Sequence, residues 1–367
     1  MEVKFLNLDI PTEQIKGKYL EAVEKILDKG NFILTEEVEN FEHAWAGTIG
    51  TKYAIGVSSG ADALYLALRA LDIGEGDEVI TQGNAYNASV TAILRVGAVP
   101  RFADIDEGSL RLDVGKMEPL INKKTKAILP VHLFGQPNDM EAVKKLAQKY
   151  KLKIIEDCAQ AHLAKFNGRS VGAWGDVAAF SFYPTKNLGA FGDAGAVTTD
   201  NEEIYKKIIA LRNLGQTAKN KHDYLGFNMR LDPFQAECLR LKLSFLEENT
   251  KARQAAGEYY DKLIKESGLS IAPVVRDPRA SHVYHLYVAR FLANNRDDVQ
   301  KELTKMGVQT AVHYPTPVYR QPFYQGPVDP CPVSDATSGQ VLSLPLYVGI
   351  IKEQQEYVID CLKKILG

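Results

Sequence analysis

The stretch S-F-Y-P-T-K-N-L-G-A-F-G-D-A-G-A, from Ser181 to Ala196, organises the rest of the sequence. The apolar run Val177–Phe182 predicts a buried strand, bounded by Asp176 and Pro184. Lys186 therefore stands just beyond a strand end, and the glycines after it allow tight turns. A lysine in a partly dry site of this kind can lose its proton and attack a carbonyl to form a Schiff base. A solvated loop lysine is the alternative.

Length and composition indicate a soluble globular protein. The 367 residues are enough for two domains. A net charge of −2 gives no sign of a nucleic-acid or membrane-surface partner, and no apolar run is long enough to cross a bilayer. No secretory signal is evident at the N-terminus. The four widely spaced cysteines favour a reducing, cytoplasmic location over a disulfide framework: Cys158, Cys238, Cys331 and Cys361.

The first part of the chain alternates between predicted strands and helices. Helices are expected at 13–29 and 36–46, and Ala54–Leu71 predicts a strand, a Ser-Ser-Gly turn and a helix. Strands at 78–81, 99–104, 127–132 and 153–157 then alternate with helices at 87–95, 114–121 and 140–150. This order predicts β-α-β units and a mostly parallel sheet, with ligands bound beyond the carboxyl ends of its strands.

The pattern changes after Pro233, where a long helical stretch runs to Lys265. We place a domain boundary within it, so that residues 1–248 form a large α/β domain and 249–367 a smaller α+β domain. The second domain has one alternating aromatic segment, Ser281–Arg290, and helices near 296–306 and 353–366. A Pro-rich loop lies between those helices. The smaller domain is expected to close one side of a cleft.

Pyridoxal phosphate is a carbonyl compound whose needs match the residues at the predicted strand ends. Asp157 is placed to face its pyridine nitrogen, Gln160 its phenolic oxygen, and Tyr86 its ring. Gly60, Ala61 and Ser181 offer donors for its phosphate at a helix start. A strand-end carboxylate at Asp157 and a helix N-cap at Ser59 or Asp62 are the structural alternatives.

Four segments resemble the sugar aminotransferases of the DegT/DnrJ/EryC1/StrS family: E-D-C-A-Q-A-H, the Ser181–Ala196 stretch, G-F-N-M-R-L-D-P-F-Q-A and A-V-H-Y-P-T-P. The resemblance runs from about Phe5 to the end. It implies the aspartate aminotransferase fold (fold type I) and a homodimer with active sites at the subunit interface. It also implies that Lys186 is the Schiff-base lysine and that Asn228 reaches the phosphate in the partner subunit.

For the substrate, the resemblance implies that Tyr183, His313 and Tyr314 surround a hexose and that Lys219 lies near its diphosphate. His162 resembles a substrate-side histidine, although a buried, hydrogen-bonded imidazole is the alternative. The sequence departs from the usual family pattern at two positions. Ala61 stands where threonine or serine is common, and Met229 stands where serine is frequent. The segment Q-G-N-A-Y-N replaces a proline-containing, doubly aromatic one, so Tyr86 is the remaining candidate for stacking.

The predicted reaction is a ping-pong transamination from L-glutamate to a nucleotide-linked keto sugar. The segments S-S-G-A-D-A-L and L-D-P-F-Q-A are similar to those of enzymes that aminate C-3 of dTDP-3-keto-6-deoxyhexoses. Amination at C-4 or of a UDP-linked sugar, and a non-catalytic sugar-nucleotide sensor, stay open as alternatives. Lys186 argues against the related dehydratases, which carry histidine there. No G-x-G-x-x-G follows an early strand, which argues against a dinucleotide-binding oxidoreductase.

Overall fold

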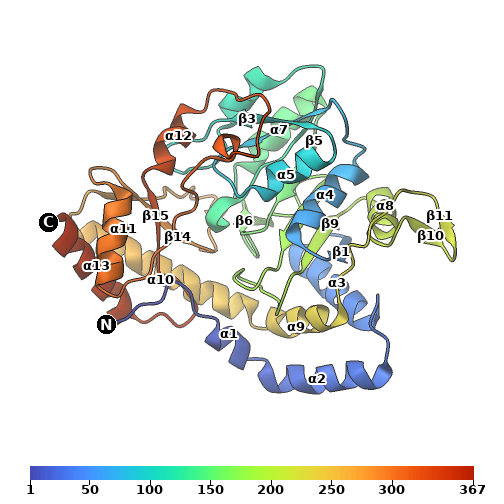
Figure 1. Ribbon diagram of the computed structural model, residues 1–367, viewed down its shortest axis with the longest axis horizontal. Helices are drawn as coiled ribbons and strands as arrows, with labels where there is room; N and C mark the ends of the chain where they lie inside the picture. The colour runs from blue at the N-terminus through green and yellow to red at the C-terminus, as the bar shows by residue number, and fades with distance from the viewer.

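The computed structural model describes residues 1–367 and is built around a seven-stranded sheet (Figure 1). The strand order is β1-β9-β8-β5-β4-β2-β3. The strands are β1 (Tyr53–Val57), β2 (Glu78–Gln82), β3 (Val99–Ala103), β4 (Thr125–Ile128), β5 (Lys153–Asp157), β8 (Val177–Ser181) and β9 (Gly195–Thr199). Neighbours pair in parallel, except that β9 runs antiparallel to β1 and β8. The predicted mostly parallel sheet is confirmed.

Helices cover both faces of this sheet, which explains why most residues of its strands are buried. The helices of this part are α3 (Glu36–Ile49), α4 (Gly60–Ala70), α5 (Ala88–Arg95), α6 (Val114–Met117), α7 (Met140–Tyr150), α8 (Glu202–Arg212) and α9 (Pro233–Leu243). Helix α4 packs on strands β8 and β9, and its Leu64, Leu66 and Leu68 are buried. This packing holds the start of α4 at the carboxyl end of the sheet, beside the loop that carries Lys186.

The C-terminal part has a three-stranded antiparallel sheet of its own, in the order β12-β14-β15. Its strands are β12 (Ile271–Pro273), β14 (Tyr287–Phe291) and β15 (Val341–Leu344), and its helices are α10 (Leu246–Ser267), α11 (Arg296–Lys305) and α13 (Lys352–Leu366). The start of the chain joins this part, because Val3 forms a bridge with Val308. Both chain ends therefore lie near α11 and α13 (Figure 1).

Three predicted elements are interrupted in the structure. The helix expected at 13–29 is divided into α1 (Asp9–Glu13) and α2 (Lys16–Lys29), with the buried side chain of Ile15 at the break. The long helical stretch after Pro233 breaks between α9 and α10. The aromatic segment 281–290 is no single strand, because Tyr284 adopts a positive φ of 45° that bends the chain. Its first residues form β13 (Ala280–Ser281) and only its end belongs to β14.

Strand β13 leaves the C-terminal sheet and pairs with a small hairpin of the large sheet's part, β6 (Lys165–Phe166) and β7 (Arg169–Ser170). Helix α12 (Pro332–Ser338) likewise returns to the large sheet, where the backbone amide of Ser334 donates to Asp104. Segments from beyond residue 249 thus pack on both parts of the molecule. The division at residues 248 and 249 stays a prediction.

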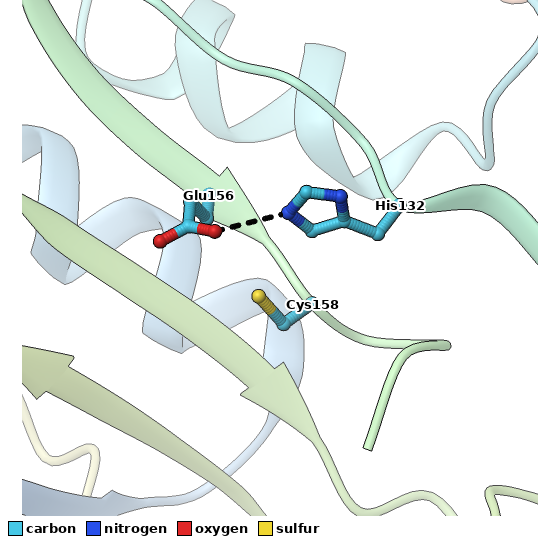
Figure 2. Close-up of side chains that lie close together, drawn as sticks. All are labelled: His132, Glu156 and Cys158. Atoms are coloured by element: carbon cyan, nitrogen blue, oxygen red, sulfur yellow. Dashed lines mark hydrogen bonds and ion pairs between the residues drawn. The ribbon is translucent and has the colours of Figure 1, made fainter. Parts of the chain in front are cut away.

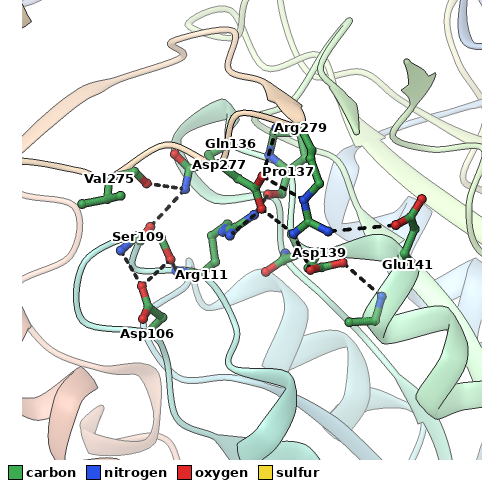
Figure 3. A network of polar contacts seen from close by, with 12 residues as sticks. Asp106, Ser109, Arg111, Gln136, Pro137, Asp139, Glu141, Val275, Asp277 and Arg279 are labelled. Carbon is green, nitrogen blue, oxygen red and sulfur yellow. Dashed lines mark hydrogen bonds and ion pairs between the residues drawn. The ribbon is translucent and has the colours of Figure 1, made fainter. Parts of the chain in front are cut away.

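A polar network joins the segment before β13 to loops of the large sheet (Figure 3). The guanidinium of Arg279 contacts Asp139 at 2.6 Å and Asp277 at 2.7 Å. Arg111 contacts the same Asp277 carboxylate at 3.2 Å. Donation from both arginines holds the pKa of Asp277 well below its usual range, despite the opposing effect of burial. The network fixes the chain that leads to Tyr284 and the residues after it.

A further small hairpin, β10 (Gln216–Ala218) and β11 (Lys221–His222), projects from the end of the molecule opposite α11 and α13 (Figure 1). Lys219 lies in its exposed turn. None of the helices combines the length and the apolar character that a bilayer crossing requires.

Candidate active site

A cavity of about 480 Å³ lies at the carboxyl ends of β1, β2, β5 and β8. It gathers ten of the predicted site residues: Gly60, Ala61, Tyr86, Asp157, Gln160, Ser181, Tyr183, Lys186, His313 and Tyr314. Eight further residues complete its wall: Ser59, Leu64, Ala88, Val131, Ala159, Thr185, Asp193 and His285. Strand ends that are distant in sequence meet here because parallel strands deliver their carboxyl ends to one edge of the sheet.

Lys186 is the only lysine or arginine on the cavity wall. It lies in the turn after β8, where its backbone amide donates to Tyr183 O at 2.8 Å, and its Nζ has no hydrogen-bond partner. Burial lowers the pKa of Lys186 to about 8, while the negative charge of Asp157 opposes that shift. A lysine with this pKa supplies a neutral amine near neutral pH, which a nucleophile or a proton carrier needs.

Asp157 ends β5 and is only 5% exposed. Its Oδ2 accepts a hydrogen bond from Ser89 Oγ at 2.6 Å, and its Oδ1 accepts one from the amide of Ala159 at 3.1 Å. The carboxylate is thus held on both sides by donors and faces the cavity as an oriented anion.

The turn between β1 and α4 forms a compact group of donors. A Cβ on Gly60 would lie 2.4 Å from Ser181 Cβ, so only glycine allows this approach. Gly195 packs as closely, since its Cβ would meet Ser59 O at 2.4 Å. The amides of Gly60 and Ala61 begin α4 and have no acceptor within the helix, and the hydroxyl of Ser181 donates to no protein group. These donors fit a phosphate.

Two aromatic residues and one amide line the opposite wall. Gln160 is buried, accepts the amide of Phe134 at 2.7 Å and donates to Tyr314 Oη at 3.1 Å. The ring of Tyr314 lies 5.8 Å from that of Tyr86, which is 59% exposed. Burial raises the pKa of Tyr314 well above its ordinary value, so its hydroxyl stays protonated. The wall offers two aromatic rings, tilted by 40° to one another, and one polar pair to a planar ring.

The residues present therefore fit pyridoxal phosphate: a free amine of lowered pKa, an oriented carboxylate, unpaired donors at a helix start and an aromatic wall. No observation of the wall conflicts with that group. The cofactor would be held by Lys186, Asp157 and the donors of Gly60, Ala61 and Ser181.

Of the two histidines expected at the substrate, His313 lines the cavity and His162 does not. His313 lines the cavity and shares a hydrogen bond with Ser343 Oγ at 2.8 Å; burial lowers its pKa to about 4. His162, expected on the substrate side, does not line the cavity. It is fully buried beside Trp45 and Phe182, and burial lowers its pKa to about 3. A neutral imidazole in an aromatic cluster is the role that this position shows.

His285 also lines the cavity, although it was not among the residues expected there. It is 8% exposed, and its Nδ1 has no hydrogen-bond partner. Burial, followed by the charge of Lys186, lowers the pKa of His285 well below its ordinary value. The bend at Tyr284 brings this side chain to the site, and periodicity alone could not predict that bend.

Asn228 and Lys219 are exposed and do not line this chain's cavity. Asn228 lies close to the turn before α4, because the carbonyl of its neighbour Met229 accepts the amide of Ser58 at 3.3 Å. The expected roles of Asn228 and Lys219 stay predictions.

His132, Glu156 and Cys158 form a buried group beside the site whose composition is typical of metal ligands (Figure 2). The amide of Asn138 donates to His132 Nδ1 at 3.1 Å, so Nε2 carries the proton and donates to Glu156 at 3.1 Å. Glu156 also accepts three backbone amides from Gly172, Trp174 and Gly175. Its oxygens are satisfied by the protein, and the group braces the end of β5.

The chain was compared with known proteins. Residues 13–363 match the family model described as the DegT/DnrJ/EryC1/StrS aminotransferase family. A dTDP-3-amino-3,4,6-trideoxy-alpha-D-glucose transaminase of Streptomyces venezuelae is 41% identical over 99% of this chain and 96% of its own. A UDP-N-acetyl-3-dehydro-alpha-D-glucosamine 3-aminotransferase of Acidithiobacillus ferrooxidans is 40% identical over 96% and 95%.

The fold agrees with these matches. The crystal structure of S. venezuelae DesV in complex with a ketimine intermediate superposes with a TM-score of 0.95, at 41% identity over 99% of this chain and 98% of the other. The expected aspartate aminotransferase fold is thereby confirmed. With the family model covering nearly the whole sequence, the chain belongs to the DegT/DnrJ/EryC1/StrS aminotransferase family.

Proposed function

We propose that this aminotransferase moves an amino group from L-glutamate to C-3 of a dTDP-linked 3-keto-6-deoxyhexose, with pyridoxal phosphate as its cofactor. The observation that carries the proposal is the unpaired Lys186 amine, of lowered pKa, in a cavity that also holds Asp157 and the α4 donors. The S. venezuelae and A. ferrooxidans relatives both bear names that specify position 3 of a hexose, which supports C-3 over C-4.

The bound cofactor would supply an electron sink and a temporary place for the amino group. The chain's own contribution is to hold and move protons. Lys186 carries a proton to and from the substrate carbon, a role for which a pKa of about 8 is suited because both protonation states are accessible near neutral pH. Asp157 would face the ring nitrogen of the bound cofactor, and the first turn of α4 would bind its phosphate.

The sugar is expected at the open side of the cavity, where Tyr183 and Tyr86 are more than half exposed. His313 and Tyr314 lie on the same wall and offer polar atoms to hexose hydroxyls. We further propose a homodimer in which Asn228 and the basic turn of Lys219 complete the partner's cavity, on the phosphate and the diphosphate respectively. Both residues are exposed and neither lines its own chain's cavity, which supports this arrangement. The four unpaired, buried cysteines suit a reducing compartment such as the cytoplasm.

An amination panel tests the substrate. The loaded protein is incubated with L-glutamate and one of three acceptors, a dTDP-3-keto-6-deoxyhexose, a dTDP-4-keto-6-deoxyhexose or a UDP-linked 3-keto acetamido sugar. Formation of 2-oxoglutarate and the mass of the product are followed. We expect the highest kcat/KM with the first acceptor. Preference for the UDP-linked or the 4-keto sugar would contradict the substrate assignment, and turnover of none would favour a sensor.

A further inference from the structure

Ser89 is a buried residue outside the cavity wall that contacts the carboxylate of the site. It is 1% exposed and lies in the first turn of α5, 68 positions before Asp157 in the sequence. Its Oγ–H donates to Asp157 Oδ2 at 2.6 Å, a length typical of a hydroxyl bonded to an ionised carboxylate. Because a carboxylate has no proton to give, the direction of this bond is fixed.

A serine caps a helix from the N-cap position, and Ser89 lies two residues beyond the N-cap of α5, so its hydroxyl is not needed as a cap. The N-cap residue of α5 is Asn87, and no side chain caps this helix. The Ser89 hydroxyl instead bonds across to the end of β5. A polar side chain that forgoes a local bond for a distant charged one points to a role at that charge.

We propose that Ser89 is a positioning residue of the active site, whose hydroxyl orients the Asp157 carboxylate that would face the ring nitrogen of the cofactor. The inference rests on the proposed cofactor site. Burial of Asp157 disfavours its charge, and hydrogen bonds to the charged form offset that cost. Only Ser89 and the amide of Ala159 donate to this carboxylate within the chain, so the serine supplies its one side-chain bond.

The same bond ties α5 to β5. Ala88, the residue before Ser89, lines the cavity. Tyr86, which also lines it, precedes the helix by two residues. The position of the stacking candidate Tyr86 is therefore set relative to Asp157 by one hydrogen bond as well as by packing. Loss of the hydroxyl is expected to change the electrostatics around Asp157 more than the position of α5, because the buried side chains of Val90, Ala92 and Ile93 still hold the helix in place.

The test compares Ser89→Ala with Ser334→Ala. Ser334 offers a matched control because it is fully buried and donates through Oγ to a buried aspartate, Asp104, at 2.9 Å, and neither residue lines the cavity. In Ser89→Ala the dissociation constant for pyridoxal phosphate is expected to rise about 10-fold, as for loss of a hydrogen bond to a charged group. The visible band of the bound cofactor is titrated with pH, and the midpoint of that titration is expected to move upward. The reason is that a ring whose nitrogen is less firmly protonated withdraws less electron density from the titrating group. Ser334→Ala is expected to lose stability without either change.

A double substitution separates positioning from packing. In an Asp157→Asn background, adding Ser89→Ala is expected to leave the band midpoint unchanged, because the charge on which Ser89 acts is gone. Equal band midpoints in wild type and Ser89→Ala, or additive effects in the double variant, would overturn the inference. Failure of the wild-type protein to take up pyridoxal phosphate would instead contradict the proposed function, so the two failures are distinguishable.

Discussion

For single residues, the chemistry of the site depends on how far burial lowers the pKa of the Lys186 amine. Lys186 has no hydrogen-bond partner for its Nζ, and burial outweighs the attraction of Asp157. The sequence pattern could predict Lys186 and Asp157, because Asp157 ends a predicted strand and Lys186 lies in the turn after another. It could not predict Ser89 or His285. Their roles depend on a contact between helix and strand, and on a bend at Tyr284, which leave no periodic signal.

The lowered pKa of Lys186 predicts how the cofactor-free protein reacts with pyridoxal phosphate. The neutral amine is the nucleophile, so the rate should rise with pH and level off above a midpoint of about 8. Stopped-flow measurements of how fast the visible absorption band grows, made from about pH 6.5 to about pH 10, give this midpoint. An exposed lysine has a pKa near 10.4. A rate still climbing at pH 10, as for such a lysine, would contradict the assigned environment.

At the scale of elements, the site depends on the close approach between the start of α4 and the end of β8. Gly60 lies against Ser181 with no room for a Cβ. The first helix turn is predictable from the Ser-Ser-Gly pattern, but the approach is not, because it depends on where β8 lies in the sheet. The strand order, with β9 inserted antiparallel between β1 and β8, likewise has no counterpart in local sequence.

Gly60→Ala is expected to displace the phosphate-binding turn and to weaken pyridoxal phosphate binding by at least about 10-fold, because two hydrogen bonds to an anion are disturbed. Gly47→Ala is the matched control. Gly47 lies within α3 with nothing within 4 Å of the added Cβ, and alanine there should stabilise the fold by about 0.5–1 kcal/mol. Equilibrium dialysis and thermal unfolding measure the two effects. Equal cofactor affinity in both variants would contradict the proposed phosphate site.

At the scale of the whole molecule, segments from the C-terminal part are tied to the large sheet by β13 and by the network around Asp277 and Arg279. The two-part organisation follows from the change in sequence pattern after Pro233. The returning segments do not, because β13 is too short to show a period. Asn228 and Lys219 resembled family positions, yet one chain alone places neither at its own site.

Asp277→Asn is expected to destabilise the protein by about 2 kcal/mol at pH 7, through loss of charged hydrogen bonds. Because the pKa of Asp277 is lowered in the folded protein, its stabilisation is present above the unfolded value of about 3.9 and decreases as pH falls from there through the lower folded pKa. Urea unfolding at pH 7 and at about pH 3 measures the difference between variant and wild type. A difference that grows toward acid pH would contradict this role for the network.

The shared site is tested by mixing inactive subunits. If Asn228 serves the partner's cavity, a dimer of one Lys186→Ala and one Asn228→Ala subunit has one doubly altered site and one intact site. Refolding the two variants together should then recover up to about a quarter of wild-type activity. Recovery of none would place Asn228 with its own subunit's site and contradict the shared site.

The most direct measurement is the visible absorption spectrum of the protein loaded with pyridoxal phosphate, before and after L-glutamate. Wild type should show a visible band that glutamate bleaches, with formation of one 2-oxoglutarate per site. Lys186→Ala should turn over at least about 10²–10⁴-fold more slowly, because the residue that moves the proton is missing. A wild-type protein that takes up no cofactor, or a Lys186→Ala variant with full transaminase activity, would contradict the central role of Lys186.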